Sequence, residues 1–300
     1  MQLDQTWLEP VTSWNAKLER AWEHVGALKE HVDEYRKSQP YELKPESTDQ
    51  PGRLAYRLRI WRPPPIRIST TVGDIVHNLR AALDAVAFEL ARRSQRGTLT
   101  ELQKRASEFP ICTTPGAFDR FMTRYKRDEL YDDDARALLR AAQPFVDLEE
   151  AIRLGVSHGN TYEERFQASL LNRLNVLWNI DKHRHLVVAE WLLRDFWWSS
   201  CGPSKRKPEQ GDGRWEDGAV LFYMVGADEG MGDKVYHEFN LVLKDDLAFD
   251  YAPDWSTDVA VLMEQFANHV GHLIRKVAWG ITTAASSGSS ANSFGCGRHI

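Results

Sequence analysis

Two polar clusters, well separated in the chain, carry the residue types that perform acid–base and phosphate chemistry. The first is G-D-I-V-H-N-L-R-A-A-L-D at Gly73–Asp84, and the second is N-I-D-K-H-R-H at Asn179–His185. Imidazole titrates near neutral pH and can move a proton, whereas arginine and lysine stabilise charge that develops on a phosphate. We expect the two clusters to lie on adjacent helices and to contribute to one site.

Helical spacing places part of the first cluster on one stripe. At 3.6 residues per turn, His77, Arg80 and Asp84 fall on one side of the predicted helix. The main apolar face lies beside this stripe, so the three side chains are predicted to be half-buried and to need partners. Asn78 and Glu89 lie on the side where a solvent face is expected.

The second cluster closes a helix predicted from about 161 to 183. Its leucines mark a buried side, and the helical period places Asp181 and Arg184 on that same side. Asn179 and His183 belong to a separate polar stripe, which is typical of a solvated face. Charges on a buried side are rare, so Asp181 and Arg184 require a specific explanation.

One hypothesis for the combined clusters is a phosphate-centred site that cleaves RNA. A histidine would remove a 2′-hydroxyl proton, and a cation would stabilise the charge on the phosphate. A carboxylate would fix a histidine tautomer or an arginine rotamer. The candidates for the proton acceptor are His77 and His183. The candidate cations are Arg80, Lys182 and Arg184, and the candidate carboxylates are Asp84 and Asp181.

A second hypothesis is a divalent metal site within a helical bundle. The available ligand types are His77, Asp84, Asp181 and His183, together with His269 or His272 from the last predicted helix. These residues form no tight signature such as H-E-x-x-H, and the interleaved arginine and lysine side chains would repel a cation. The sequence therefore predicts no metal ligand set and no cofactor.

The favoured hypothesis is non-catalytic. The clusters would form a buried polar network that fixes the register of the helices, and the protein would act as a binding or interaction module. Such a network is costly unless every member is paired, yet it can specify a unique packing. Beside the histidines and arginines, its predicted members are Asn78, Asp84, Asn179, Asp181 and Lys182.

The two motifs also carry a resemblance. H-N-L-R-A-A-L-D at His77–Asp84, followed by N-I-D-K-H-R at Asn179–Arg184, resembles an uncharacterised bacterial helical family with H-N-L-R-x-A-L-D and N-x-x-K-H-R in this order. That resemblance implies a helical shape and no established activity. A weaker likeness is to the HEPN helical-bundle superfamily, several of whose members are metal-independent ribonucleases with an R-x(4-6)-H motif. Arg153 and His158 have this spacing, but Gly155 is poorly suited to the middle of a helix.

Composition limits the functional classes. The net charge of −5 does not favour nucleic acid, so RNA or another phosphate-bearing ligand would bind through local charge. The three cysteines are scattered and odd in number, which argues against a disulfide framework. Because the chain shows no leader pattern and no long apolar run, we predict a cytoplasmic protein without membrane contact. The sequence is compatible with a homo-oligomer and identifies no particular partner.

The elements that must position these clusters indicate an α+β fold, mainly an α-helical bundle with a small antiparallel β-sheet. We predict one helix-rich domain over 1–281, with hairpins near 41–62 and 220–243, and a disordered tail over 282–300. The first central helix is predicted to open at Gly73, after the capping residues Ser69–Thr71.

Overall fold

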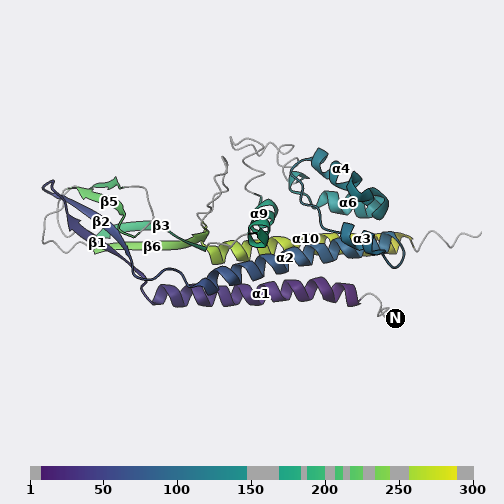
Figure 1. Ribbon diagram of the computed structural model, residues 1–300, viewed down its shortest axis with the longest axis horizontal. Helices are drawn as coiled ribbons and strands as arrows, with labels where there is room; N and C mark the ends of the chain where they lie inside the picture. The colour runs from purple at the N-terminus through teal and green to yellow at the C-terminus, as the bar shows by residue number, and fades with distance from the viewer. Residues whose placement is uncertain are drawn as a thin grey trace, which may run out of the picture. The chain divides into compact units, whose positions relative to one another are not determined.

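The computed structural model describes residues 8–146, 169–183, 188–199, 207–211, 217–225, 234–243 and 257–288. It confirms the predicted fold class, since helices dominate and the strands form small antiparallel sheets (Figure 1). The longest elements are three helices: α1 (Leu8–Lys37), α2 (Ile66–Ser94) and α10 (Val259–Gly288).

The chain divides into two compact units, whereas the sequence predicts one domain. Unit 1 takes its described residues from within 1–24, 73–185 and 263–300, and unit 2 from within 25–72 and 186–262. Each of the three long helices contributes residues to both units. A hydrophobic pattern that continues along one helix therefore does not reveal where one unit ends and the next begins.

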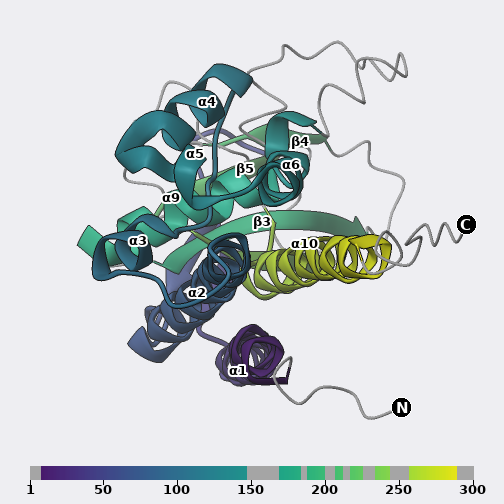
Figure 2. The ribbon, with the colours of Figure 1, turned by 90° about the vertical axis from the view of Figure 1, so that its right-hand side faces the viewer.

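Unit 1 contains short helices that follow α2, and Figure 2 shows α4, α5 and α6 grouped together. Local capping explains why they start where they do. The side chains of Thr100, Thr114 and Asp132 each accept a backbone N–H from the first turn of the helix that follows. The elements are α3 (Glu101–Ala106), α4 (Pro115–Thr123), the 3-10 turn η2 (Arg124–Lys126), α5 (Arg127–Leu130), α6 (Asp133–Ala141) and, later in the chain, α9 (Leu170–His183).

Helix α2 begins earlier than predicted. It starts at Ile66, directly after Pro65, so Gly73 lies inside the helix and does not open it. A proline fits a helix start because the first N–H groups have no acceptor within the helix. Thr70 and Thr71 are not caps, since their hydroxyls donate to the carbonyl of Arg67 inside the helix at 3.0 and 2.7 Å.

Glu89 on α2 corrects a second expectation, because it is 1% exposed and does not face solvent. Arg92 and Arg93, one turn further along, each place Nε 2.8 Å from one of its carboxylate oxygens. Burial acts to raise the pKa of Glu89, but these hydrogen bonds hold it below its usual range. The helical period assigns a charged residue to the solvent face. Arginine partners at i+3 and i+4 allow Glu89 to be buried instead.

Unit 2 contains both sheets. β1 (Tyr41–Ser47) and β2 (Arg53–Ile60) form the predicted hairpin near 41–62, with Tyr41 opposite Ile60. Two further strands, β5 (Val220–Val225) and β4 (Lys207–Gln210), extend this sheet to the order β1-β2-β5-β4. A separate two-stranded sheet pairs β3 (Val188–Ser199) with β6 (Lys234–Leu243).

The predicted hairpin at 220–243 is wrong. Both of its strands exist, but β5 pairs with β2 and β4, whereas β6 pairs with β3. Tyr56 of β2 stacks on Phe222 of β5 with ring centres 4.7 Å apart, which ties β5 to the first hairpin. Alternating apolar residues predict that a segment is a strand, but they do not identify its partner.

The predicted disordered tail also begins too early. Helix α10 continues to Gly288, so 282–288 are helical, and 289–300 lie outside the described residues. The alanine pair Ala284–Ala285 favours this extension, since alanine has the highest helix propensity. In the part of the chain that the structure describes, no helix has both the length and the apolar character needed to cross a bilayer.

Asp258 joins three elements of unit 2 and is buried. Its Oδ2 accepts a hydrogen bond from Arg36 of α1 at 2.5 Å and one from the backbone N–H of Leu241 of β6 at 3.3 Å. Its Oδ1 accepts the N–H of Ala260 at 3.1 Å, which caps the start of α10. One carboxylate therefore holds a helix start, a strand and a second helix together.

We expect Asp258→Ala to lower the free energy of unfolding by about 2–3 kcal/mol, because it removes a helix cap and leaves Arg36 without its partner. Urea unfolding measures this change. Asp33→Ala is the control, since Asp33 is an exposed residue of α1, and it should change stability by less than about 0.5 kcal/mol. Equal effects of the two substitutions would contradict the role of Asp258.

Candidate functional site

The two predicted clusters meet in unit 1, because α9 lies against α2. A β-carbon added to Gly73 of α2 would lie 2.8 Å from Oδ1 of Asp181 on α9. Further along α2, the guanidinium of Arg80 lies 4.9 Å from the centre of the Trp178 ring of α9. The absence of a side chain at Gly73 thus permits the close approach of the two helices at this point.

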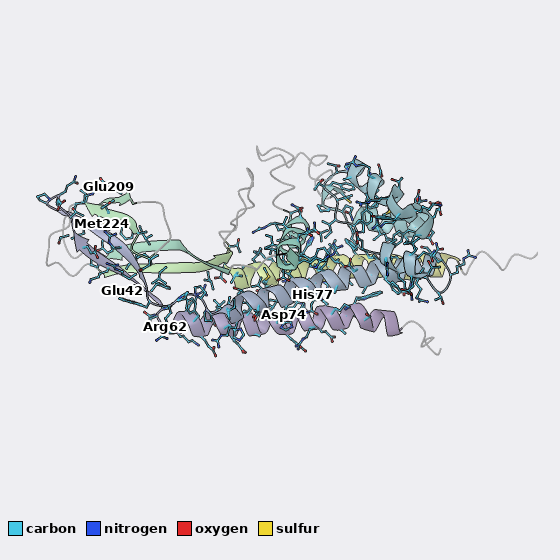
Figure 3. The ribbon with its side chains drawn as sticks, viewed as in Figure 1. Glu42, Arg62, Asp74, His77, Glu209 and Met224 are labelled. Atoms are coloured by element: carbon cyan, nitrogen blue, oxygen red, sulfur yellow. The ribbon has the colours of Figure 1, made fainter. Side chains whose placement is uncertain are left out.

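Around His77 the site is exposed and acidic. Asp74 and His77 project from α2 one turn apart (Figure 3), and both act electrostatically on Asp181 of α9. The pKa of Asp181 is raised, mainly by partial burial. The charge of Asp74 acts in the same direction, and that of His77 acts against it. Two carboxylates beside one imidazole make this place unfavourable for a phosphate.

Arg80 is buried, at 5% exposed, and its hydrogen bonds are made within the fold. Its Nη2 donates to the backbone carbonyl of Phe109 at 2.8 Å and lies 3.1 Å from Oδ1 of Asp84, one turn along α2. Trp178 covers the guanidinium from α9. These contacts leave Arg80 unsuited to binding a phosphate from solution.

Asp84 completes the same contact from the other side. Its Oδ1 accepts the backbone N–H of Phe109 at 2.9 Å, so Arg80 and Asp84 together bind both backbone polar groups of one residue, Phe109. Burial raises the pKa of Asp84, although Arg80 and the Phe109 N–H both act to lower it. The pair predicted at i, i+4 is therefore a device that holds a distant backbone segment on α2.

Two more buried side chains hold the same segment, Ala106–Cys112, which we call the clamped segment. Arg127 of α5 donates from Nε to the carbonyl of Ala106 at 2.8 Å. Gln143, just after α6, accepts the N–H of Cys112 at 3.0 Å and donates to the carbonyl of Pro110 at 3.0 Å. The clamped segment is irregular, so these side chains supply partners that a strand or helix would otherwise provide.

The other predicted site residues have different surroundings. Asn78 donates to the carbonyl of Asp74 within α2 at 2.8 Å. Asn179 is exposed, and the ammonium of Lys182 lies 4.1 Å from the centre of the Trp178 ring. The side chain of His183 and the whole of Arg184 lie outside what the structure describes, as do Arg153 and His158 of the predicted R-x(4-6)-H motif.

The metal hypothesis receives no support from the side chains that the structure describes. Among them, no group of three or more His, Cys, Asp or Glu residues is placed to hold a metal ion. His272 of α10 is exposed.

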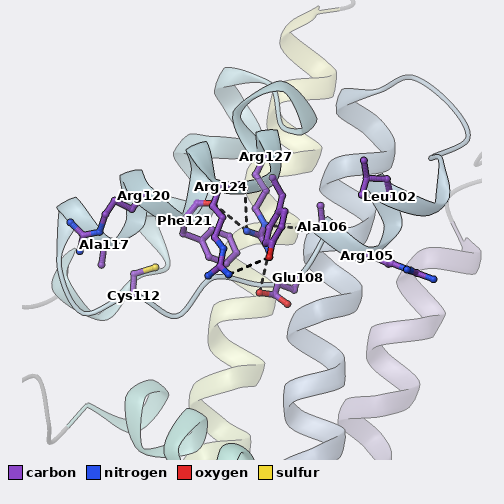
Figure 4. Close-up of a pocket in the computed structure, with 11 residues that line it drawn as sticks. Leu102, Arg105, Ala106, Glu108, Cys112, Ala117, Arg120, Phe121, Arg124 and Arg127 are labelled. Atoms are coloured by element: carbon purple, nitrogen blue, oxygen red, sulfur yellow. Dashed lines mark hydrogen bonds and ion pairs between the residues drawn. The ribbon is translucent and has the colours of Figure 1, made fainter.

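A pocket of about 820 Å³ lies on the outer side of the clamped segment (Figure 4). We call it the arginine pocket. Its walls come from α3, the clamped segment, α4, η2 and the start of α5, and its charged lining consists of four arginines and one acidic residue, Glu108. The polar and large side chains that line it are Arg105, Arg120, Arg124, Arg127, Glu108, Cys112, Leu102, Phe121 and Tyr125.

The four arginines differ in how they are held. Arg127 is buried and rigid, since it binds the carbonyl of Ala106 and lies 3.3 Å from Oε1 of Glu108, with its guanidinium 3.9 Å from the centre of the Phe121 ring. Figure 4 shows it at the middle of the pocket. Arg105, Arg120 and Arg124 are exposed, and within the described residues none of these three forms an ion pair with a carboxylate.

Two features of the pocket wall limit its chemistry. Burial raises the pKa of the Cys112 thiol to about 11, although Arg127 and Arg120 act to lower it, so this thiol stays protonated near neutral pH and is a poor nucleophile. Tyr125 and Lys126 both have left-handed backbone, with φ of 59° and 54°. This conformation costs roughly 1–2 kcal/mol for each non-glycine residue, and such strain concentrates at binding sites.

None of the residues that line the arginine pocket is among the predicted site residues, although the sequence carries a pattern that indicates it. R-F-M-T-R-Y-K-R at Arg120–Arg127 interleaves basic and aromatic residues, which is a pattern typical of anion-binding surfaces. This run contains no histidine, whereas both predicted clusters do. Comparison of the chain with protein-family models, curated proteins and solved structures found no match.

The contact between Gly73 and Asp181 can be tested with a double-mutant cycle. Glycine in a helix costs about 1 kcal/mol relative to alanine, so Gly73→Ala should stabilise a variant that already carries Asp181→Ala. In the natural chain, the new methyl group would displace Asp181, and the gain should be smaller by at least about 0.5 kcal/mol. Urea unfolding of the four proteins measures this coupling. The same effect of Gly73→Ala in both backgrounds would show that α9 does not approach α2 here.

Asp84 should give a characteristic pH dependence. A carboxyl group whose pKa is higher in the folded state binds more protons there, so its contribution to stability increases as the pH falls through that raised pKa. We therefore expect the natural chain to gain free energy of unfolding relative to Asp84→Asn between pH 7 and pH 4. Chemical unfolding at several pH values measures this difference. A relative loss over this range would mean that the ion pair with Arg80 dominates.

Proposed function

We propose that the protein is a non-catalytic binding module whose ligand is a small anion held in the arginine pocket. The observation that supports it is that Nη2 of Arg80 and Oδ1 of Asp84 bind the backbone carbonyl and N–H of Phe109. The motif that looks like a reaction centre therefore acts as a structural clamp. The polar groups left for a ligand lie on the other side of the same segment, in the arginine pocket.

The arginines of unit 2 provide a contrast that supports this proposal. On β2, Arg57 and Arg59 bind Glu46, at 2.8 and 3.4 Å, and Arg53 lies 3.1 Å from Glu209. Each of these cations lies beside a carboxylate within the sheet, and Arg57 and Arg59 share Glu46. The exposed arginines of the pocket have no such ion pair among the described residues, and they surround a concave site. Unpaired cations in a pocket favour an anionic ligand.

The ribonuclease hypothesis remains a prediction, since Arg153 and His158 lie outside the described residues. The geometry at His77 favours the binding module, because Asp74 and Asp181 would repel a scissile phosphate. The cytoplasmic location that the sequence predicts remains part of this proposal.

The structural half of the proposal predicts that Arg80→Met destabilises the protein by about 3 kcal/mol, because it leaves Asp84 and the Phe109 carbonyl without their partner. His77→Ala should change stability by less than about 0.5 kcal/mol, since His77 is exposed. Urea unfolding measures both. A fluorogenic RNA substrate, with EDTA present, provides the functional readout. RNA cleavage that His77→Ala abolishes would overturn the non-catalytic assignment.

The binding half is tested with inorganic pyrophosphate as the probe. A ligand that binds the folded state raises the melting temperature, here by about 2–5 °C at saturating concentration. The double variant Arg120→Gln/Arg124→Gln should remove this rise. Lys126→Gln is the matched control, since Lys126 adjoins Arg124 in sequence, is not part of the pocket wall and pairs with Glu129. An equal rise in all three proteins would exclude the arginine pocket as the site.

A further inference from the structure

We propose that the ligand of the arginine pocket is a compact molecule in which two or more linked phosphates are attached to a flat aromatic group. This inference rests on the proposed function, since it names the ligand class for the same pocket. It follows from three observations: the excess of arginines, the exposed ring of Tyr125 at the pocket and the limited volume of the site.

The charge of the pocket favours more than one phosphate. Four arginines and one glutamate leave an excess of three positive charges in one concave site. A single phosphate would neutralise part of this charge, whereas linked phosphates would bring several acceptor oxygens to several guanidinium groups. Arginine suits this task because its planar group can hold a phosphate through two parallel hydrogen bonds. Arg127 is buried, and its guanidinium is used on three backbone carbonyls and on Glu108. The cations left for a ligand are therefore Arg105, Arg120 and Arg124, which are exposed.

The aromatic group follows from Tyr125 and Leu102. Both are among the exposed large hydrophobic residues of the described chain, at 60% and 71% exposed, and both line the pocket. Arg124 donates from Nη2 to the Tyr125 hydroxyl at 3.2 Å and lies 4.9 Å from the centre of its ring. Arg127 lies 5.3 Å from the same ring centre, so the ring has two cations beside it while the residue stays 60% exposed. A flat aromatic group can stack on such a ring, with its phosphates directed at the arginines.

The size of the pocket and the net charge of the chain favour a compact ligand over a nucleic acid strand. A volume of about 820 Å³ lies within the range of small-molecule sites. Proteins that bind a single strand instead present a basic groove that follows successive phosphates. The net charge of −5 repels a long polyanion over the whole surface, whereas a small ligand responds to the local excess of arginines.

Isothermal titration calorimetry at fixed ionic strength tests the inference with four probes: inorganic triphosphate, adenosine triphosphate, adenosine and a short single-stranded RNA. We expect adenosine triphosphate to bind about tenfold more tightly than inorganic triphosphate, since stacking of one base contributes roughly 1–3 kcal/mol. Adenosine alone should bind at least a hundredfold more weakly than adenosine triphosphate, because it has no group for the arginines.

Two substitutions at Tyr125 separate stacking from folding. Tyr125→Phe keeps the ring and should retain the tenfold preference. Tyr125→Asn removes the ring but suits the left-handed backbone, since asparagine adopts this conformation more readily than most residues. In this variant, adenosine triphosphate and inorganic triphosphate should bind with about equal affinity, and inorganic triphosphate should still bind. Trp61→Asn is a control for loss of an exposed ring elsewhere, because Trp61 lies in unit 2 and is 64% exposed.

The outcomes distinguish this inference from the proposed function. Equal affinities for the two triphosphates, unchanged in Tyr125→Asn, would overturn the aromatic group and leave the anion-binding function in place. Tighter binding of RNA than of adenosine triphosphate would overturn the compact ligand. If none of the phosphate-bearing probes binds, both the inference and the proposed function are wrong.

Discussion

The hydrogen bonds that bind the clamped segment are the interaction on which unit 1 depends. After Ala106, the last residue of α3, residues 107–112 have neither helix nor strand to satisfy their backbone, yet Phe109 is buried. Arg80 and Asp84 bind both polar groups of Phe109, while Arg127 and Gln143 bind the residues on either side. A buried backbone group without a partner costs free energy comparable to a lost hydrogen bond, so these side chains make the irregular path possible.

The clamp has two consequences for function. On its inner side, Nη2 of Arg80 and Oδ1 of Asp84 bind the backbone of Phe109 and each other. On its outer side, it fixes Glu108 and Cys112 as part of the wall of the arginine pocket. Arg127 contributes to both sides, because its Nε holds the carbonyl of Ala106 while its guanidinium lines the pocket. The structural network and the proposed ligand site therefore share one segment, and a change in one affects the other.

The network also contains atoms that are costly to bury. Among the described residues, Nε of Arg80 and the hydroxyl of Tyr131 are buried without a hydrogen-bond partner. Burial raises the pKa of Tyr131, with Asp84 and Glu108 acting in the same direction and Arg127 against it. Such atoms remain where the surrounding packing holds them more strongly than their desolvation opposes it.

The sequence by itself determined the apolar face of α2 and the i, i+4 relation of Arg80 and Asp84, because these follow from the period of a single element. It placed Glu89 on a solvent face and Asp181 on a buried side, whereas Glu89 is buried and Asp181 is exposed. It also indicated that the two polar clusters would meet, and Gly73 and Asp181 do lie together. Only the tertiary structure decided that Arg80 and Asp84 bind Phe109, that β5 pairs with β2 and not with β6, and that the arginines of α4, η2 and α5 surround a pocket. The physical reason is that periodicity describes the faces of one element, whereas a hydrogen-bond partner depends on which distant segments the packing brings together.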